Sequence, residues 1–323
     1  MPKIFVTRLI PDSGLKMLRD KGFELTVSPH DRVLTKEEII TELKNGYDAM
    51  LCLLTDKIDA EVMDAGLPQL KMIANYAVGF DNIDLKAAAE RNLVITNTPG
   101  VLTETVAEHA FSLLLSIAHR IPESDRFTRT GKYVGWAPML LLGTDVSSKT
   151  LGVVGLGRIG SRVAHHAVRG FGMKVLYHDP KPNPDFEKEY GAVYKEKLED
   201  LLAEADFVSI HVPLMDSTRH LINADRFKQM KPTAYLINTS RGPIVDEAAL
   251  VEALQGGTIR GAALDVYENE PQLAAGLAEL ENVVLTPHTA SATEGTRAKM
   301  AELAARNIVE FLEGRTPPNV VKA

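Results

Sequence analysis

The stretch Leu151-Gly152-Val153-Val154-Gly155-Leu156-Gly157-Arg158-Ile159-Gly160 decides the fold of the central part of this chain. Its apolar beginning predicts a short buried strand, and three glycines follow at the spacing Gly155-x-Gly157-x-x-Gly160. Residues 161–168 are typical of a helix, and Met173 to Asp179 predicts a second strand that ends in an acid. This order of strand, glycine turn, helix, strand and carboxylate indicates a unit that binds a dinucleotide.

Each glycine of the turn has a physical task in such a unit. Gly155 permits the tight turn, Gly157 lets the backbone approach a pyrophosphate, and Gly160 lets the helix pack closely on the strand. The pyrophosphate would lie at the helix N-terminus, where unpaired N–H groups and the helix dipole favour an anion. We expect the cofactor to contact the whole turn, which comprises Gly155, Leu156, Gly157, Arg158, Ile159 and Gly160.

Asp179 predicts which dinucleotide is bound. It follows the last glycine at close to the roughly 20 residues expected for an acid that binds a ribose. Its carboxylate can accept hydrogen bonds from the ribose hydroxyls and would repel a 2′-phosphate, so we expect NAD. NADP is the alternative, because Lys181 could tolerate a phosphate. A glycine turn that only joins a strand to a helix is a further alternative, which the position of Asp179 disfavours.

The composition is that of an ordinary globular protein with room for two domains. The chain has 323 residues, of which 45% are hydrophobic and 24% charged. Its net charge of −7 argues against nucleic-acid or membrane partners. Cys52 is the only cysteine, which excludes an intrachain disulfide, and the N-terminus has no long apolar segment. We therefore expect a cytoplasmic protein, and we expect no metal site.

Predicted strands alternate with predicted helices along the whole chain, which indicates an α/β fold with parallel sheets covered on both faces. We expect a Rossmann-type dinucleotide-binding domain over residues 101–287. Residues 1–100 and 288–323 would form a smaller flavodoxin-like α/β domain that binds substrate, with a cleft between the two domains. Long helices are predicted from Thr103 to about Arg120 and from about Thr293 to Glu313.

Three ionisable residues stand just after predicted strands of the second half. They are Arg241 after residues 234–238, Glu270 after residues 261–266, and His288 after residues 283–286. In an open α/β sheet the carboxyl ends of the strands form the ligand crevice, so we expect these side chains at one site. Taken singly, each could instead be an ordinary surface or ion-pair residue.

Together the three suit the interconversion of a 2-oxo acid and a 2-hydroxy acid by hydride transfer. Arg241 offers a planar fork for a carboxylate or a carbonyl oxygen. His288 would donate a proton to the carbonyl oxygen during reduction and take it back during oxidation. Glu270 would orient the imidazole and favour its protonated form.

Four motifs in this order resemble those of the D-isomer-specific 2-hydroxyacid dehydrogenases. They are the glycine turn, residues 238–246 (NTSRGPIVD), residues 268–271 (ENEP) and residues 286–290 (TPHTA), and residues 75–84 (NYAVGFDNID) resemble the family's substrate-domain segment. Within the family the chain is most similar to the glyoxylate/hydroxypyruvate reductases, through residues 54–59, residues 78–80 and the segment around Trp136.

The resemblance implies roles for particular residues. Arg241, Glu270 and His288 would be the catalytic trio, and backbone amides at Val78 and Gly79 would hold the substrate carboxylate. The substrate would also contact Arg241 and His288. Further cofactor contacts are implied at Thr105, Val212, Pro213, Thr218, Thr239, Asp265 and His288. A homodimer is implied as well, with the cofactor domains and the loop around Trp136 at its interface; burial of Trp136 in its own core is the alternative.

Two kinds of alternative stay open at this point. Within the family, the chain could be a D-3-phosphoglycerate or D-lactate dehydrogenase. Outside enzymes, it could be a dinucleotide-sensing corepressor on the same fold, since such proteins keep the trio.

Overall fold

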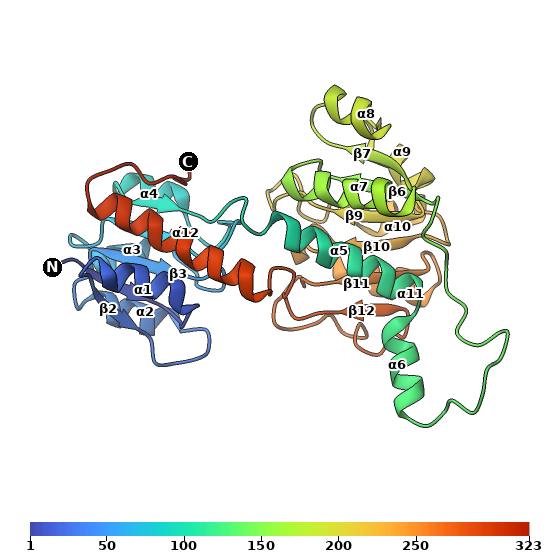
Figure 1. Ribbon diagram of the computed structural model, residues 1–323, viewed down its shortest axis with the longest axis horizontal. Coiled ribbons are helices and arrows are strands. Elements are labelled where there is room, and N and C mark those ends of the chain that lie inside the picture. Colours follow the sequence, from blue (N-terminus) through green and yellow to red (C-terminus); the bar gives the residue numbers. More distant parts are fainter. Residues whose placement is uncertain (323) are drawn as a thin grey trace. The chain divides into compact units, whose positions relative to one another are not determined.

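The computed structural model describes residues 1–322 and divides into two compact units (Figure 1). The first unit contains Met1–Leu102 and the C-terminal segment from Ala292 onward. The second contains Thr103–Ser291. Both are α/β units with one parallel sheet, as the sequence predicts. No helix within residues 1–322 is long and apolar enough to cross a membrane.

The first unit is built on a five-stranded sheet in the order β2-β1-β3-β4-β5, in which every pair of neighbours is parallel. This order is that of flavodoxin-like folds. Its strands are β1 (Lys3–Val6), β2 (Glu24–Val27), β3 (Ala49–Cys52), β4 (Met72–Asn75) and β5 (Val94–Thr96). Its helices are α1 (Asp12–Asp20), α2 (Lys36–Leu43), α3 (Ala60–Gly66), α4 (Leu85–Glu90) and α12 (Glu294–Leu312).

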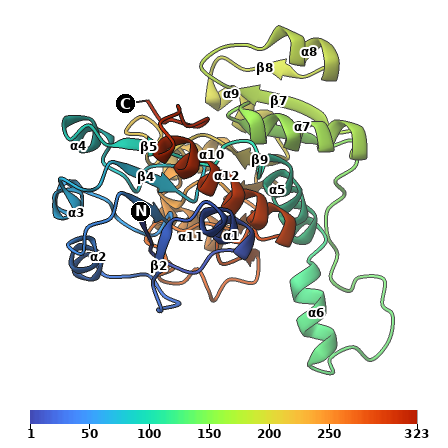
Figure 2. The same ribbon diagram turned by 60° about the vertical axis from the view of Figure 1, so that its left-hand side comes forward.

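Helices cover both faces of this sheet. Helices α2, α3 and α4 lie on one face and α1 and α12 on the other (Figure 2). The α1–α12 contact is very close, because a Cβ at Gly14 would lie 2.5 Å from the carbonyl oxygen of Ala301. Only glycine fits there, so the last long helix packs directly against the first.

The second unit is built on a seven-stranded sheet in the order β12-β11-β10-β9-β6-β7-β8, again with parallel neighbours. The strands are β6 (Thr150–Val154), β7 (Lys174–His178), β8 (Val193–Tyr194), β9 (Phe207–Ile210), β10 (Tyr235–Asn238), β11 (Gly261–Leu264) and β12 (Val283–Leu285). After β6 the chain adds β7 and β8 on one side of this strand, and it then crosses to the other side to form β9. The topological switch point of this Rossmann-type sheet therefore lies between β6 and β9.

The helices of the second unit also form two layers. They are α5 (Thr103–Ala118), α6 (Ile121–Arg129), α7 (Arg158–Phe171), α8 (Pro184–Tyr190), α9 (Leu198–Glu204), α10 (Ala224–Gln229) and α11 (Glu247–Gln255), with a 3-10 turn, η1 (Gly242–Ile244). Successive strand residues enter opposite layers: Val153 packs with α5 and α7, whereas Val154 packs with α9, α10 and α11. Each fully buried apolar side chain of this kind contributes about 1.5–3 kcal/mol.

Local capping explains where several helices begin. Thr35 forms a capping box with Glu38 at the start of α2. Asp246 and Thr293 accept hydrogen bonds from the first turns of α11 and α12. Helix α6 was not predicted, and it differs from the others because none of its residues is buried.

Candidate active site

The glycine turn after β6 has the geometry that its spacing predicts. Gly155 has φ +94°, in the region that favours glycine. A Cβ at Gly160 would lie 2.1 Å from the carbonyl oxygen of Gly155, so helix and turn touch. A Cβ at Gly157, in contrast, would meet no atom of the described chain within 4 Å. The turn therefore leaves no room for a side chain at Gly160, where it packs on the helix. It leaves free space at Gly157, the residue expected to face a pyrophosphate.

The start of α7 is available to an anion. Gly157 is its N-cap residue, and no side chain of residues 1–322 caps this end. The first amides of a helix have no partner within the helix, and its dipole is positive there. Asp179, directly after β7, accepts a hydrogen bond from the backbone amide of Leu156 at 2.8 Å through Oδ2. The carboxylate thus lies beside the glycine turn.

The other residues expected to contact the cofactor lie at the same edge of this sheet or on α5. Val212, Pro213 and Thr218 follow β9, and the Thr218 hydroxyl donates to the Pro213 carbonyl oxygen at 2.7 Å. Thr239 follows β10, and its buried Oγ1 has no hydrogen-bond partner among residues 1–322. An unsatisfied buried hydroxyl costs about 1–3 kcal/mol, which a ligand group could relieve. Together with the open Gly157, this orphan hydroxyl fits a bound dinucleotide.

The three expected catalytic residues follow three adjacent strands. Arg241 comes after β10, Glu270 after β11 and His288 after β12. His288 Nδ1 and Glu270 Oε2 lie 2.9 Å apart, and Glu270 Oε1 accepts a hydrogen bond from the Tyr267 amide at 3.1 Å. The Tyr267 amide thereby holds one oxygen of the Glu270 carboxylate, and the other oxygen orients the His288 imidazole. Nε2 is the ring nitrogen left for a reacting group.

The backbone at His288 is strained and held in place. His288 has φ +53°, a left-handed conformation that is uncommon outside glycine. Its amide donates to the carbonyl oxygen of Asp265 at 2.9 Å. The Asp265 carboxylate, which is fully buried, accepts from the amides of Thr289 and Ala290 at 2.8 Å each. Asp265 thus anchors the turn that carries His288.

Asp265 also receives two side-chain contacts. The Thr286 hydroxyl donates to Oδ1 at 2.6 Å, and His109 Nε2, from α5, lies 3.4 Å from the same oxygen. Burial alone would raise the pKa of Asp265, but the hydrogen bonds from His109 and Thr286 leave it below its ordinary value. The side chain therefore stays ionised as an acceptor for this turn.

Arg241 is positioned by the turn that follows β10. Its Nη1 donates to the carbonyl oxygen of Ser240 at 2.8 Å, and its own carbonyl oxygen accepts from Asn238 at 3.0 Å. At the next residue, a Cβ on Gly242 would lie 1.9 Å from the carbonyl of Tyr267. The Arg241 turn and the Glu270 loop therefore touch through backbone alone.

Comparisons with known proteins identify the family of the chain. The model of the family "D-isomer specific 2-hydroxyacid dehydrogenase, NAD binding domain" matches residues 111–290. The chain belongs to the D-isomer-specific 2-hydroxyacid dehydrogenases. The match bears out the resemblance and the expected binding of NAD.

Relatives of this dehydrogenase match over nearly its whole length. It is 52% identical over 322 residues to the glyoxylate reductase of Korarchaeum cryptofilum, covering 99% of this chain and 96% of that protein. Identity to the glyoxylate reductase of Thermococcus kodakarensis is 48% over 324 residues, covering 99% of this chain and 96% of that protein. Among solved structures, an NADPH-dependent glyoxylate/hydroxypyruvate reductase from Sinorhizobium meliloti has a TM-score of 0.86 at 35% identity, covering 99% of this chain and 97% of that one.

Two acids and a histidine support the Glu270 loop of the dehydrogenase through contacts that the sequence does not reveal. Glu247, at the start of α11, accepts hydrogen bonds from the amides of Glu268 at 3.3 Å and Ala274 at 3.0 Å. Glu268 in turn lies 2.6 Å from His220 Nε2. Burial raises the pKa of Glu247, and the neighbouring charges of Glu268 and Glu270 act in the same direction. These partners lie far apart in sequence, so no local pattern could have revealed them.

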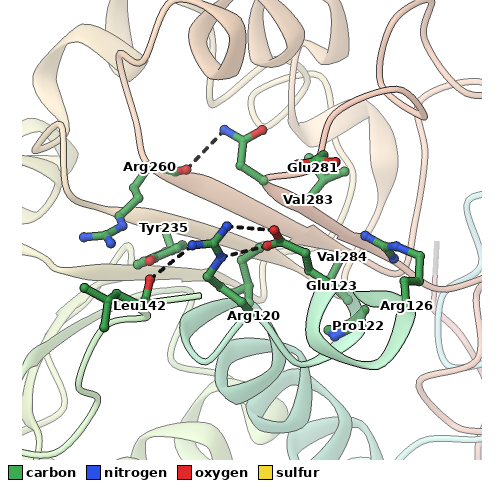
Figure 3. A pocket seen from close by; sticks show the side chains of 12 residues that line it. Arg120, Pro122, Glu123, Arg126, Leu142, Tyr235, Arg260, Glu281, Val283 and Val284 are labelled. Atoms are coloured by element: carbon green, nitrogen blue, oxygen red, sulfur yellow. Dashed lines mark hydrogen bonds and ion pairs between the residues drawn. The ribbon is translucent and has the colours of Figure 1, made fainter. Parts of the chain in front are cut away.

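A separate hollow in the dehydrogenase lies at the other end of the strands (Figure 3). It contains Tyr235 and Val283, the first residues of β10 and β12. Figure 3 shows Arg120 paired with Glu123 through two contacts of 2.7 Å. The trio follows the carboxyl ends of these same strands, so this hollow is not the catalytic site.

Val78 and Gly79 belong to the other unit, in the loop after β4. The structure thus brings the trio and the cofactor candidates, except Thr105 on α5, to one sheet edge of the second unit. It places the expected substrate-carboxylate amides in the first unit.

Proposed function

We propose that this dehydrogenase reduces glyoxylate and hydroxypyruvate to glycolate and D-glycerate, with NADH as the reductant. The observation that carries the proposal is the 2.9 Å contact between His288 and Glu270. Arg241 follows β10, which is the neighbour of β11, the strand before Glu270. The named relatives support the choice of substrate, because proteins at 52% and 48% identity are glyoxylate reductases.

A nicotinamide dinucleotide held by the turn from Gly155 to Gly160 and by Asp179 would supply the hydride that reduces the carbonyl carbon of the substrate. His288 donates a proton from Nε2 to the carbonyl oxygen, so that the C=O group becomes CH–OH. Glu270 stabilises the protonated ring through Nδ1 and holds it in one orientation. The Arg241 guanidinium binds the carboxylate and polarises the carbonyl oxygen.

The cofactor is held by the edge formed by β6, β7, β9 and β10. We assign the pyrophosphate to the turn from Gly155 to Gly160 at the start of α7, and the adenosine ribose to Asp179. Thr105, Val212, Pro213, Thr218, Thr239 and Asp265 are the remaining proposed contacts. The charge of Asp179 favours NADH, although the reductase from Sinorhizobium meliloti uses NADPH.

We assign substrate binding to the first unit, which the sequence predicts over residues 1–100 and 288–323, and cofactor binding to the second unit, predicted over residues 101–287. In the structure the chain returns to the first unit only after Ser291, so His288 belongs to the second unit. In this assignment the amides of Val78 and Gly79 take the substrate carboxylate. The single cysteine, Cys52, is a buried free thiol, which fits the reducing, cytoplasmic compartment that we propose.

We infer that two copies form a homodimer through α6 and the loop after it. No residue of α6 is buried, and Val134, Trp136 and Met139 are 97%, 83% and 76% exposed. A contiguous exposed apolar segment of this kind marks an interface. Light scattering of the purified protein should give twice the chain mass, and Val134→Glu should give the monomer. Val193→Glu, at a half-exposed position on β8, is the matched control and should leave the dimer intact.

A substrate panel tests the reaction. The purified protein is assayed with glyoxylate, hydroxypyruvate, pyruvate and 3-phosphohydroxypyruvate, each with NADH and NADPH. We expect the highest kcat/KM with glyoxylate or hydroxypyruvate, at a kcat within about 1–1,000 s⁻¹. Preference for pyruvate or for the phosphorylated acid would make it a D-lactate or D-3-phosphoglycerate dehydrogenase, and dinucleotide binding without turnover would make it a sensor.

A further inference from the structure

The loop after β4 has three consecutive carbonyl oxygens, and each accepts a hydrogen bond. The Thr98 amide donates to the Ala77 carbonyl oxygen at 2.8 Å. Asn97 Nδ2 donates to the Val78 carbonyl oxygen at 2.7 Å. Asn75 Nδ2 donates to the Gly79 carbonyl oxygen at 2.9 Å. The orientation of three successive peptide planes is therefore set from one side.

Fixing these carbonyls also fixes the amides opposite them. In a planar trans peptide the C=O of one residue and the N–H of the next point in opposite directions. The cis bonds within residues 1–322 are Leu67–Pro68 and Glu270–Pro271, so the peptides of this loop are trans. The Ala77 carbonyl thus orients the Val78 amide, and the Val78 carbonyl orients the Gly79 amide. Within residues 1–322, neither of these two amides donates a hydrogen bond.

The two asparagines are themselves rigidly placed. β4 and β5 pair in parallel with Ala74 opposite Thr96. Asn75 and Asn97 come one residue later and so lie at the same end of the two strands. The fully buried Asn75 has its amide nitrogen 3.0 Å from Asn82 Oδ1. The backbone of Asn97 is tied to the C-terminal part of the unit, because its carbonyl oxygen accepts from Asn307 at 3.2 Å. The Asn75 side chain cannot turn away without breaking its contact with Asn82, and the backbone that carries the Asn97 side chain is held in place.

We propose that Asn97 is a positioning residue that holds the Gly79 amide ready for the substrate carboxylate, beside the Val78 amide that the Thr98 contact orients. This inference rests on the proposed function, in which these amides bind that carboxylate. Donors that are oriented before binding need no reorganisation when the anion arrives, which favours affinity. Asn97 acts on the peptide between Val78 and Gly79 itself. Loss of its side-chain amide should therefore weaken substrate binding directly.

The test uses two variants that lack the donor. Asn97→Ala removes the side chain, and Asn97→Leu replaces it with an apolar group of similar size, which separates the lost hydrogen bond from a lost volume. We expect the KM for glyoxylate and the Ki for oxamate, an unreactive 2-oxo acid analogue, each to rise about 10-fold. The kcat should stay within about threefold and the Kd for NADH within about twofold, because the carboxylate contact is made equally in ground and transition state.

Thr35→Ala is the matched control. It removes the capping box of α2 in the same unit and lowers stability without touching this loop. Equal rises of KM in Thr35→Ala and Asn97→Ala would overturn the inference, because destabilisation alone would then explain both. Unchanged KM and Ki in the Asn97 variants, with an active wild type, would overturn the inference and leave the proposed function standing. A wild type that reduces no 2-oxo acid would overturn both.

Discussion

Glu247 and Glu268 each accept a hydrogen bond from the other's backbone amide, both at 3.3 Å. The second oxygen of Glu247 accepts from the Ala274 amide, so one carboxylate holds the chain on both sides of Glu270. Glu247 is only 4% exposed, and its bonds bridge residues from two segments of the second unit. It therefore connects the helix after the Arg241 turn to the loop of the proposed catalytic carboxylate.

Glu247→Ala should weaken both stability and catalysis. Two partly buried amides lose their acceptor, which should lower the free energy of unfolding by about 1–3 kcal/mol. The Glu270 loop also loses its support, so kcat/KM should fall while the Kd for NADH stays unchanged. Denaturant unfolding and steady-state kinetics measure these effects, with the exposed Glu252→Ala on the same helix as the control. Normal kinetics in a destabilised Glu247→Ala would show that Glu247 supports only the fold.

Asp179 should control the choice between NADH and NADPH. Asp179→Asn keeps an oxygen that can accept from the Leu156 amide but removes the negative charge. The ratio of kcat/KM for NADH to that for NADPH should therefore fall, mainly through a higher KM for NADH. Asp179→Ala should lower this ratio too. It should also cost some activity, because the Leu156 amide of the glycine turn loses its acceptor. Asp185→Ala, in the exposed first turn of α8, should leave the ratio unchanged. A wild type that prefers NADPH would contradict this reading of Asp179.

Arg241 should not tolerate replacement by lysine. Arg241→Lys keeps the charge but loses the planar fork that binds a carboxylate through two hydrogen bonds. We expect kcat/KM for glyoxylate to fall about 10- to 100-fold, the effect of about 1.5–3 kcal/mol for a hydrogen bond to a charged group. Dinucleotide affinity should be little changed. Arg260→Lys, beside Tyr235 at the other end of β10, is the control. Unaltered glyoxylate kinetics in Arg241→Lys would remove Arg241 from the site.

The sequence predicted the parts of the fold that local chemistry determines. The glycine turn could be predicted because the conformation of Gly155 and the close packing of Gly160 each exclude a side chain. The helix predicted from Thr103 ends at Ala118, and the one predicted from about Thr293 to Glu313 spans Glu294–Leu312. Both have buried apolar residues at helical spacing. Helix α6 has none, so the periodicity that predicts a helix was missing.

The supporting contacts of the site could not be predicted in the same way. Asn97 meets Val78 through a strand pairing, and Glu247 meets Ala274 through a loop that returns to α11. Such contacts depend on tertiary structure, and asparagine or glutamate at these positions has no distinctive local pattern. The left-handed backbone of His288 is equally invisible in the sequence, because it results from the bonds to Asp265.

The last prediction separates the proposed proton donor from its partner. If His288 is the acid in reduction, its protonated form must be present, so kcat/KM should fall above a limiting pH. Glu270→Gln keeps the shape and a hydrogen-bonding group but removes the charge 2.9 Å from Nδ1. The protonated ring then loses its counter-charge, so kcat/KM should fall, although by less than in a variant that lacks the imidazole. His288→Ala should cost about 10²- to 10⁴-fold in rate at every pH, as expected for a lost general acid. NADH affinity should survive both changes, because the Gly155–Gly160 turn is untouched. An unchanged kcat/KM in Glu270→Gln would show that the contact between the two side chains does not govern the proton transfer.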